Sequence, residues 1–83
     1  MTYELVYTKT AFSDIKKLDA TSKKRIKNKI EKFTENPISH AKKLINFSIG
    51  EYRWRIGDYR VIFDLDEKNI VILRVKHRRE SYK

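Results

Sequence analysis

A two-residue turn inside an alternating segment most strongly constrains how this chain can fold. Residues 51–56 alternate between apolar and cationic side chains, so a strand here has one apolar and one cationic face. Gly57-Asp58 follows with glycine first, which suits a tight hairpin turn. Residues 59–65 alternate again, with Arg60 opposite the apolar face. The segment therefore predicts an antiparallel hairpin whose apolar face consists of Tyr52, Trp54, Ile56, Tyr59, Val61, Phe63 and Leu65.

The N-terminal half predicts a strand followed by two helices. Residues 2–8 are rich in β-branched and aromatic side chains, and they predict a first strand in which Tyr3 and Tyr7 are packing residues. A first helix is predicted over residues 9–19. Its apolar stripe consists of Phe12, Ile15 and Leu18.

The second predicted helix begins near Thr21 or Ser22, either of which is a plausible N-cap. It ends at Asn36-Pro37, because the residue before proline is pushed out of the helical region. Its apolar seam consists of Ile26, Ile30 and Phe33.

The C-terminal half completes a mixed fold. Residues 37–50 predict an irregular connection, and 70–75 form a near-continuous apolar run typical of a central strand. The connection carries the basic patch Lys42 and Lys43 and the apolar anchors Leu44, Phe47 and Ile49. The order β-α-α-β-β-β predicts an α+β fold, a small antiparallel-rich sheet with a two-helix hairpin packed on one face, in a single domain over residues 1–83.

Composition limits the possible partners. The 20 Lys and Arg against 11 Asp and Glu give a net charge of +9 over 83 residues, which points to an anionic partner. Without cysteine, and with His40 and His77 far apart, neither a disulfide nor a metal site is expected, and no cofactor is implied. No apolar run suggests a membrane span or a signal peptide, so a cytoplasmic protein without membrane contact is expected.

The cations of the hairpin have two competing explanations. Arg53 and Arg55 point the same way and lie about 6.6–6.8 Å apart along a strand. They can bridge a phosphate together with Arg60, if the turn sets the register. Alternatively, they form ion pairs across the hairpin, for which the available acids are Glu51, Asp58 and Asp64. Three converging guanidinium groups favour the phosphate.

The C-terminal segment adds a second basic group. Residues 74–83 carry a histidine whose ordinary pKa lies near neutrality, His77, and a tyrosine able to stack on a base or to pack the tail against the sheet, Tyr82. Simple alternation places His77 on the face of Val71, Leu73 and Val75. The cations expected to contact RNA in this segment are Arg74, Lys76, Arg79 and Lys83.

These motifs together resemble the RelE branch of the RelE/ParE toxin superfamily. The resemblance covers nearly the whole chain and depends on Gly57-Asp58-Tyr59-Arg60 combined with the closing His77-Arg78-Arg79 and Tyr82. It implies a toxin of a type II toxin–antitoxin system that enters the ribosomal A site and cuts mRNA. The ribose 2′-hydroxyl is the nucleophile and no metal takes part. The implied partners are the ribosome, mRNA and a cognate antitoxin with an acidic or amphipathic segment.

The resemblance also implies roles for individual residues. Arg60 matches the arginine that stabilises charge on the phosphate, Arg78 the arginine near the leaving oxygen, and Tyr82 the tyrosine that orients the nucleotide. Arg53 and Arg55 stand where the best-known members have lysines, and arginine stays protonated. Proton transfer would therefore fall to Tyr82 or His77, of which Tyr82 is favoured, or to groups of the ribosome.

Two alternative functions remain open at this point. One is a ParE-like inhibitor of DNA gyrase with the same fold. The other is a noncatalytic or decayed toxin that only binds antitoxin or RNA.

Overall fold

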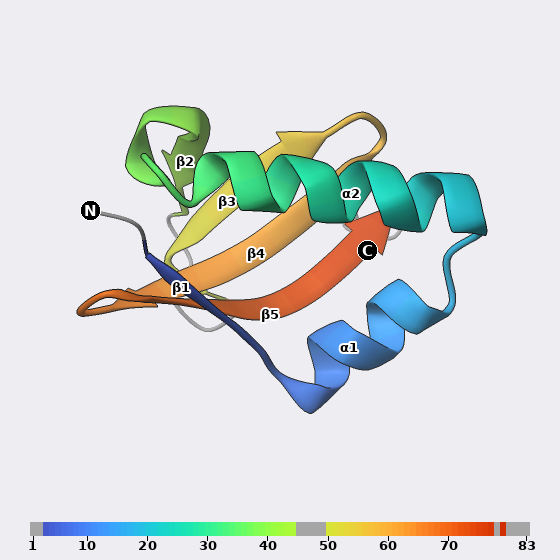
Figure 1. Cartoon of the computed structure of the whole chain (residues 1–83), viewed down its shortest axis with the longest axis horizontal. Coiled ribbons are helices and arrows are strands. Elements are labelled where there is room, and N and C mark those ends of the chain that lie inside the picture. The colour runs from blue at the N-terminus through green and yellow to red at the C-terminus, as the bar shows by residue number, and fades with distance from the viewer. Residues whose placement is uncertain (1–2, 45–49, 78, 80–83) are drawn as a thin grey trace.

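The chain folds into a five-stranded sheet covered by helices, as the computed structural model shows (Figure 1). The structure describes residues 3–44, 50–77 and 79. The strands are β1 (Glu4–Tyr7), β2 (Ala41–Lys43), β3 (Tyr52–Ile56), β4 (Tyr59–Asp66) and β5 (Asn69–His77), in the order β1-β5-β4-β3-β2. The helices are α1 (Lys9–Lys16), α2 (Ala20–Phe33) and the 3-10 turn η1 (Ile38–His40). The predicted α+β fold is confirmed.

Strands β3, β4 and β5 form the expected antiparallel meander. Strand β1 was also expected, but which strand it pairs with was not predicted. It pairs in parallel with residues 69–72 of β5, which makes the first half of β5 a central strand as expected. Strand β2 was not predicted, because three residues are too few for alternation to be visible. It extends the sheet beside β3, within the segment expected to be irregular. Phe47 and Ile49 lie outside the described residues.

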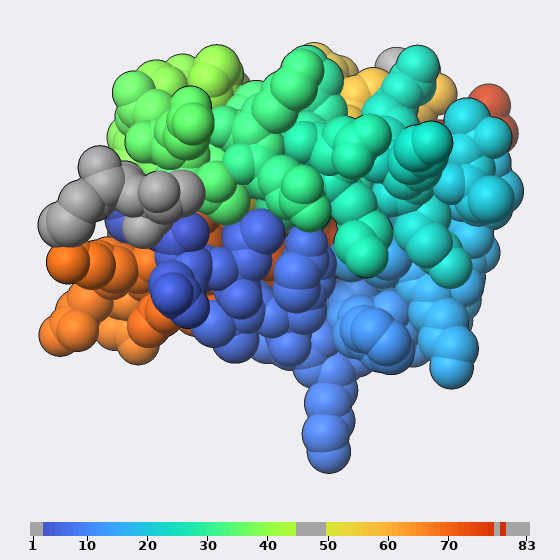
Figure 2. Space-filling model, viewed as in Figure 1, coloured from blue at the N-terminus to red at the C-terminus, as the bar shows by residue number. Residues whose placement is uncertain are grey.

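The core lies between the sheet and the helices. Ile26 and Ile30 of α2 are fully buried against the predicted apolar face of the sheet, as are Trp54, Val61 and Phe63. The rings of Trp54 and Phe63 stack with centroids 4.0 Å apart, and Trp54 Nε1 donates to the carbonyl of Pro37 at 3.0 Å. Tyr3 and Tyr7 pack against this cluster, as predicted. Figure 2 shows the helical face, with α2 above α1 and β1.

Helix α1 begins at Lys9 as predicted, but its end, its apolar stripe and the start of α2 differ from the prediction. The stripe of α1 was partly wrong, because Phe12 is 62% exposed while Ala11 and Ile15 are buried. Helix α1 ends three residues early, at Lys16. The N-cap of α2 is Asp19 rather than Thr21 or Ser22, since its carboxylate accepts the N–H of Ser22 at 3.3 Å.

Helix α1 protects an edge of the sheet that β1 leaves open. Strand β1 ends opposite Ile72, so among the described residues no strand pairs with the second half of β5 on that side. Thr8 Oγ1 donates to the carbonyls of Ile72 and Leu73, and the carboxylate of Asp14 accepts the N–H of Val75 at 3.0 Å. Side chains at the start of α1 and within it therefore satisfy backbone groups that an exposed edge would present to other chains.

A bulge in the β4–β5 ladder corrects the predicted face of His77. Ile62 pairs with Arg74 and Phe63 with Ile72, so Leu73 is the extra residue. Ile70 and Ile72 are therefore buried in the core before the bulge, and Val75 is buried there after it. His77 shares a face with Val75, as predicted, but not with Val71. The described residues contain no helix long and apolar enough to cross a membrane.

Candidate functional site

The face of the sheet opposite α2 carries a line of three cations. Arg55 lies directly opposite Arg60, and Arg60 lies directly opposite Lys76 on its other side. Directly opposed residues have Cα atoms about 4.5–5.5 Å apart, and their side chains project to the same face. We call Arg55, Arg60 and Lys76 the cationic row. The predicted convergence of Arg55 and Arg60 is therefore present, and Lys76 joins them.

The turn at Gly57-Asp58 sets this register. Gly57 has a φ of 58°, which glycine adopts without the penalty that a Cβ brings, at the first position of a two-residue turn. Ile56 and Tyr59 therefore face each other, and the next pair outward is Arg55 and Arg60. A slip of one residue would turn every side chain of one strand to the other face. The hairpin thus places the row at the end of the sheet.

The neighbouring row is interrupted by an apolar residue. Lys42 lies opposite Arg53, and Arg53 lies opposite Ile62, which is 8% exposed. Gly50 lies against the side chains of Ile62 and Leu73, where an added Cβ would clash with Ile62. This contact covers the middle of the open face. Among the residues that the structure describes, a line of three paired cations lies at the turn end of the sheet.

One of the three acids considered for ion pairs across the hairpin, Asp64, has a backbone partner. Asp64 Oδ1 accepts the N–H of Glu51 at 2.7 Å, so one of the acids serves the backbone. Within the described part of the chain, no ion pair involves Arg55. Like charges directly opposite each other in a sheet are destabilising. Arg55 is therefore better suited to binding an anion than to stabilising the fold.

Arg74 was predicted to contact RNA, and the structure ties it to α1. Its Nε donates to Asp14 Oδ2 at 2.9 Å, and its Nη2 lies 3.3 Å from Oδ1. Asp14 also accepts the N–H of Val75, and its side chain is only 12% exposed. Arg74 thus connects the end of α1 to β5. No local pattern signals this pair, because its members are 60 residues apart in the sequence.

His77 lies on the opposite side of the sheet from the cationic row. Its ring meets the ring of Tyr59 edge to face, with centroids 5.3 Å apart and planes at 87°. Its Nδ1 accepts the N–H of Arg79 at 3.2 Å, so in the neutral ring the proton is on Nε2. His77 and Lys76 are neighbours in the chain and point to opposite faces. The structure therefore does not bring His77 into the row.

Of the remaining predicted residues, Arg79 belongs to the part of the chain that the structure describes. Arg79 is exposed, two residues beyond the end of β5. Arg78, Tyr82 and Lys83 lie outside the described residues. The described residues include no cluster of three or more acidic or histidine side chains suited to a metal.

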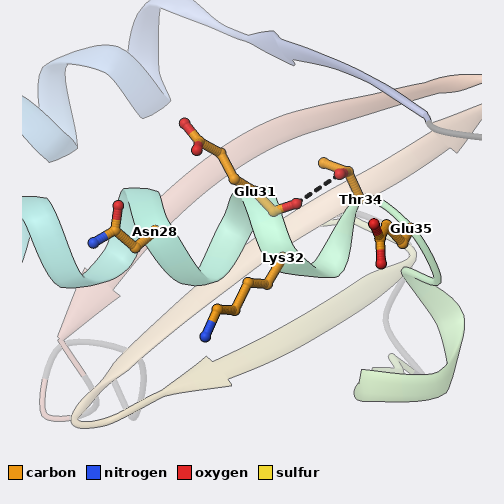
Figure 3. A pocket seen from close by; sticks show the side chains of 5 residues that line it. All are labelled: Asn28, Glu31, Lys32, Thr34 and Glu35. Atoms are coloured by element: carbon orange, nitrogen blue, oxygen red, sulfur yellow. Dashed lines mark hydrogen bonds between the residues drawn. The ribbon is translucent and has the colours of Figure 1, made fainter.

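A pocket of about 660 Å³ lies on α2, away from the cationic row. Figure 3 shows Asn28, Glu31, Lys32, Thr34 and Glu35 around it, with Thr34 Oγ1 donating to the carbonyl of Glu31 at 2.6 Å. Its two carboxylates outnumber its one ammonium group, so it is a poor site for an anion. The charge of the chain thus points to the sheet and not to this pocket.

Comparison with known proteins gives consistent similarities in sequence and in fold. Residues 5–82 match the family described as the ParE toxin of the type II toxin–antitoxin system parDE. The putative toxin RelE1 of Methanocaldococcus jannaschii is 32% identical, and the alignment covers 100% of this chain and 98% of that protein.

Two solved structures share the fold over most of the chain. A chain in the toxin–antitoxin complex RelBE2 of Mycobacterium tuberculosis is 28% identical with a TM-score of 0.85, covering 94% of this chain and 100% of the other. A chain in the archaeal RelE-RelB complex of Pyrococcus horikoshii is 28% identical with a TM-score of 0.77, covering 94% and 97%.

Proposed function

Because this chain belongs to the RelE/ParE family of toxins of type II toxin–antitoxin systems, we propose that it is a ribosome-dependent endoribonuclease. In this proposal it enters the A site in the cytoplasm, cuts the mRNA codon there and thereby stops translation. The observation that carries the proposal is the cationic row. Three cations at adjacent positions, on a rigid sheet, match a substrate whose backbone carries a negative charge at every nucleotide.

The row suits the charge that develops during cleavage. The 2′-oxygen of the ribose attacks the neighbouring phosphorus and loses its proton, the bond to the 5′-oxygen breaks, and that oxygen takes up a proton. The products are a 2′,3′-cyclic phosphate and a 5′-hydroxyl. Negative charge on the phosphate oxygens increases as the new bond forms. Arg60, between Arg55 and Lys76, is placed to stabilise this charge through fixed positive groups.

Arginine cannot supply the base for this reaction, since a guanidinium group stays protonated. We assign Arg53 and Arg55 to phosphate binding and Arg78 to the leaving oxygen. Deprotonation of the 2′-hydroxyl falls to Tyr82, with His77 as the second candidate. The position of His77 across the sheet from the row supports this order.

An antitoxin is the second proposed partner. Both similar structures described above come from toxin–antitoxin complexes. A net charge of +9 on 83 residues favours an antitoxin with an acidic or amphipathic segment. Such a segment would cover the basic surface and prevent contact with RNA.

The test is primer extension on mRNA from ribosomes exposed to the purified protein. Wild type should produce cuts at the A-site codon, and Arg60→Ala should lower the single-turnover rate by about 10²–10³. Arg60 faces away from the core, so the variant should remain folded. The control Lys29→Ala removes a cation from the exposed side of α2 and should cut like wild type.

Two results would contradict the proposal. One is wild-type protein that leaves ribosome-bound mRNA intact but stabilises DNA breaks by gyrase, as the ParE alternative requires. The other is a folded Arg60→Ala protein that cuts at the wild-type rate, which would remove Arg60 from the mechanism.

A further inference from the structure

A second pocket lies at the same end of the sheet as the cationic row, between the end of α1 and the paired ends of β4 and β5. Its volume is about 360 Å³, within the range of sites that bind small molecules. The polar groups around it are Asp14 from α1, Lys17 at the C-cap of α1, Tyr59 from β4, and Arg74 and His77 from β5. None of the functions discussed above uses this pocket as a unit.

The pocket combines positive charge with aromatic rings. The Asp14 carboxylate accepts hydrogen bonds from Arg74 and from the N–H of Val75. It is therefore not a dedicated partner of the Lys17 ammonium group. His77 accepts at Nδ1 from Arg79, so Nε2 is the donor. Tyr59 and His77 are half-buried and meet edge to face. Cations beside aromatic rings are the combination that binds single-stranded nucleic acid.

The pocket adjoins the cationic row around the rim of the sheet. Tyr59 precedes Arg60 in β4, and His77 follows Lys76 in β5. Tyr59 pairs with His77 as Arg60 pairs with Lys76, so the two sites are one residue apart along the strands and on opposite faces. Strand β4 begins at Tyr59 and β5 ends at His77. The two sites therefore meet at the rim of the sheet, and an RNA strand that rounded this rim would contact both.

We propose that this pocket is a nucleotide subsite, which binds the base and phosphate of an RNA nucleotide next to the one held at the cationic row. Lys17 contacts the phosphate, and the rings of Tyr59 and His77 contact the base. Arg74, fixed by Asp14, adds positive charge at the wall. The inference rests on the proposed function, because the neighbouring nucleotide belongs to the mRNA that the row holds.

The test uses the full-length toxin without ribosomes and two probes, adenosine 5′-monophosphate and inorganic phosphate. In two-dimensional amide NMR, the nucleotide should shift signals around Lys17, Tyr59 and His77, and it should bind more tightly than phosphate alone. Lys17→Gln should weaken nucleotide binding about tenfold, as expected for a lost charged hydrogen bond. The matched control Lys16→Gln makes the same change one residue earlier, outside the pocket, and should bind like wild type.

A second variant separates the base from the phosphate. His77→Asn removes the ring and should weaken binding of the nucleotide while leaving binding of inorganic phosphate unchanged. If the nucleotide and phosphate bind equally tightly, the pocket does not recognise a base and the inference is wrong.

Three further results distinguish the subsite from the proposed function. Signal shifts confined to the cationic row would overturn the subsite. It would also be overturned if an acidic peptide displaced the probes while single-stranded RNA displaced neither. Nucleotide binding in the pocket by a protein that cuts no mRNA on ribosomes would support the subsite and contradict the proposed function.

Discussion

Arg55 and Arg60 face each other directly across the β3–β4 hairpin, one pair beyond the turn. Each is a cation at a position where a neutral partner would serve the sheet better. Arg55→Gln should therefore raise the free energy of unfolding by about 0.2–1 kcal/mol at low salt, and less at high salt because of screening. The same variant should bind single-stranded RNA more weakly.

Urea denaturation at two salt concentrations measures the first effect, and filter binding measures the second. Lys29→Gln, on the exposed side of α2, is the control for both. If Arg55→Gln were less stable than wild type at low salt, the two arginines would not repel each other in the folded protein.

Asp14 holds α1 to β5 through two different groups, the guanidinium of Arg74 and the N–H of Val75. Asp14→Ala should lower the free energy of unfolding by about 1.5–3 kcal/mol, because a charge-assisted bond and a backbone bond are lost together. Arg74 is 40% exposed, so solvent screens part of the ion pair. Asp14→Asn should lose less of the free energy of unfolding, since its amide oxygen can still accept the N–H of Val75.

Chemical denaturation of both variants checks this order. The control is Asp58→Ala at the exposed hairpin turn, which should change the stability by no more than about 0.5 kcal/mol. Equal losses in Asp14→Ala and Asp14→Asn would mean that the bond to Val75 contributes nothing.

Glu67, in the turn between β4 and β5, has a φ of 56° although it is not glycine. A side chain in this left-handed region carries a steric cost that glycine does not. Glu67→Gly should therefore raise the free energy of unfolding by about 0.5–1 kcal/mol, even after the greater flexibility of glycine in the unfolded chain. Thermal unfolding of this variant beside Lys68→Gly gives the comparison. A melting temperature for Glu67→Gly below that of wild type would contradict the expected relief of steric strain.

The N-cap of α2 should make part of the stability depend on pH. Hydrogen bonds from Ser22 hold the pKa of the Asp19 carboxyl below its ordinary value of 3.8. A carboxyl with a lowered pKa in the folded state stabilises the protein above its unfolded pKa, and this contribution is lost as the pH falls through the folded pKa. The loss should therefore occur below pH 3.8.

Asp19→Asn keeps a capping oxygen but has no titrating group. The difference in melting temperature between wild type and Asp19→Asn should shrink or reverse as the pH is lowered from neutrality into this range. A difference that is constant with pH would show that the cap does not depend on the charge of Asp19.

Much of the fold follows from patterns that act over a few residues. Alternation in β3 and β4, glycine at the first turn position and the seam of Ile26 and Ile30 each fix a local geometry and a buried face. The turn also fixes the register, so the pairing of Arg55 with Arg60 could be predicted. Local steric preference and side-chain periodicity are properties of the sequence itself.

Other features depend on distant segments and on the relative energies of competing contacts, and these features were decided by the tertiary structure. Phe12 is exposed and Ala11 buried because α1 packs along the edge of β5, a position that the helical period alone cannot specify. The bulge at Leu73 turns the first half of β5 relative to the second, and so changes which residues share the face of His77. Asp14 and Arg74 meet across 60 residues, and the pocket beside them exists only because α1 ends there. Such contacts form where burial and hydrogen bonding in the assembled core outweigh the entropic cost of closing a long loop. A local pattern carries no information on that balance.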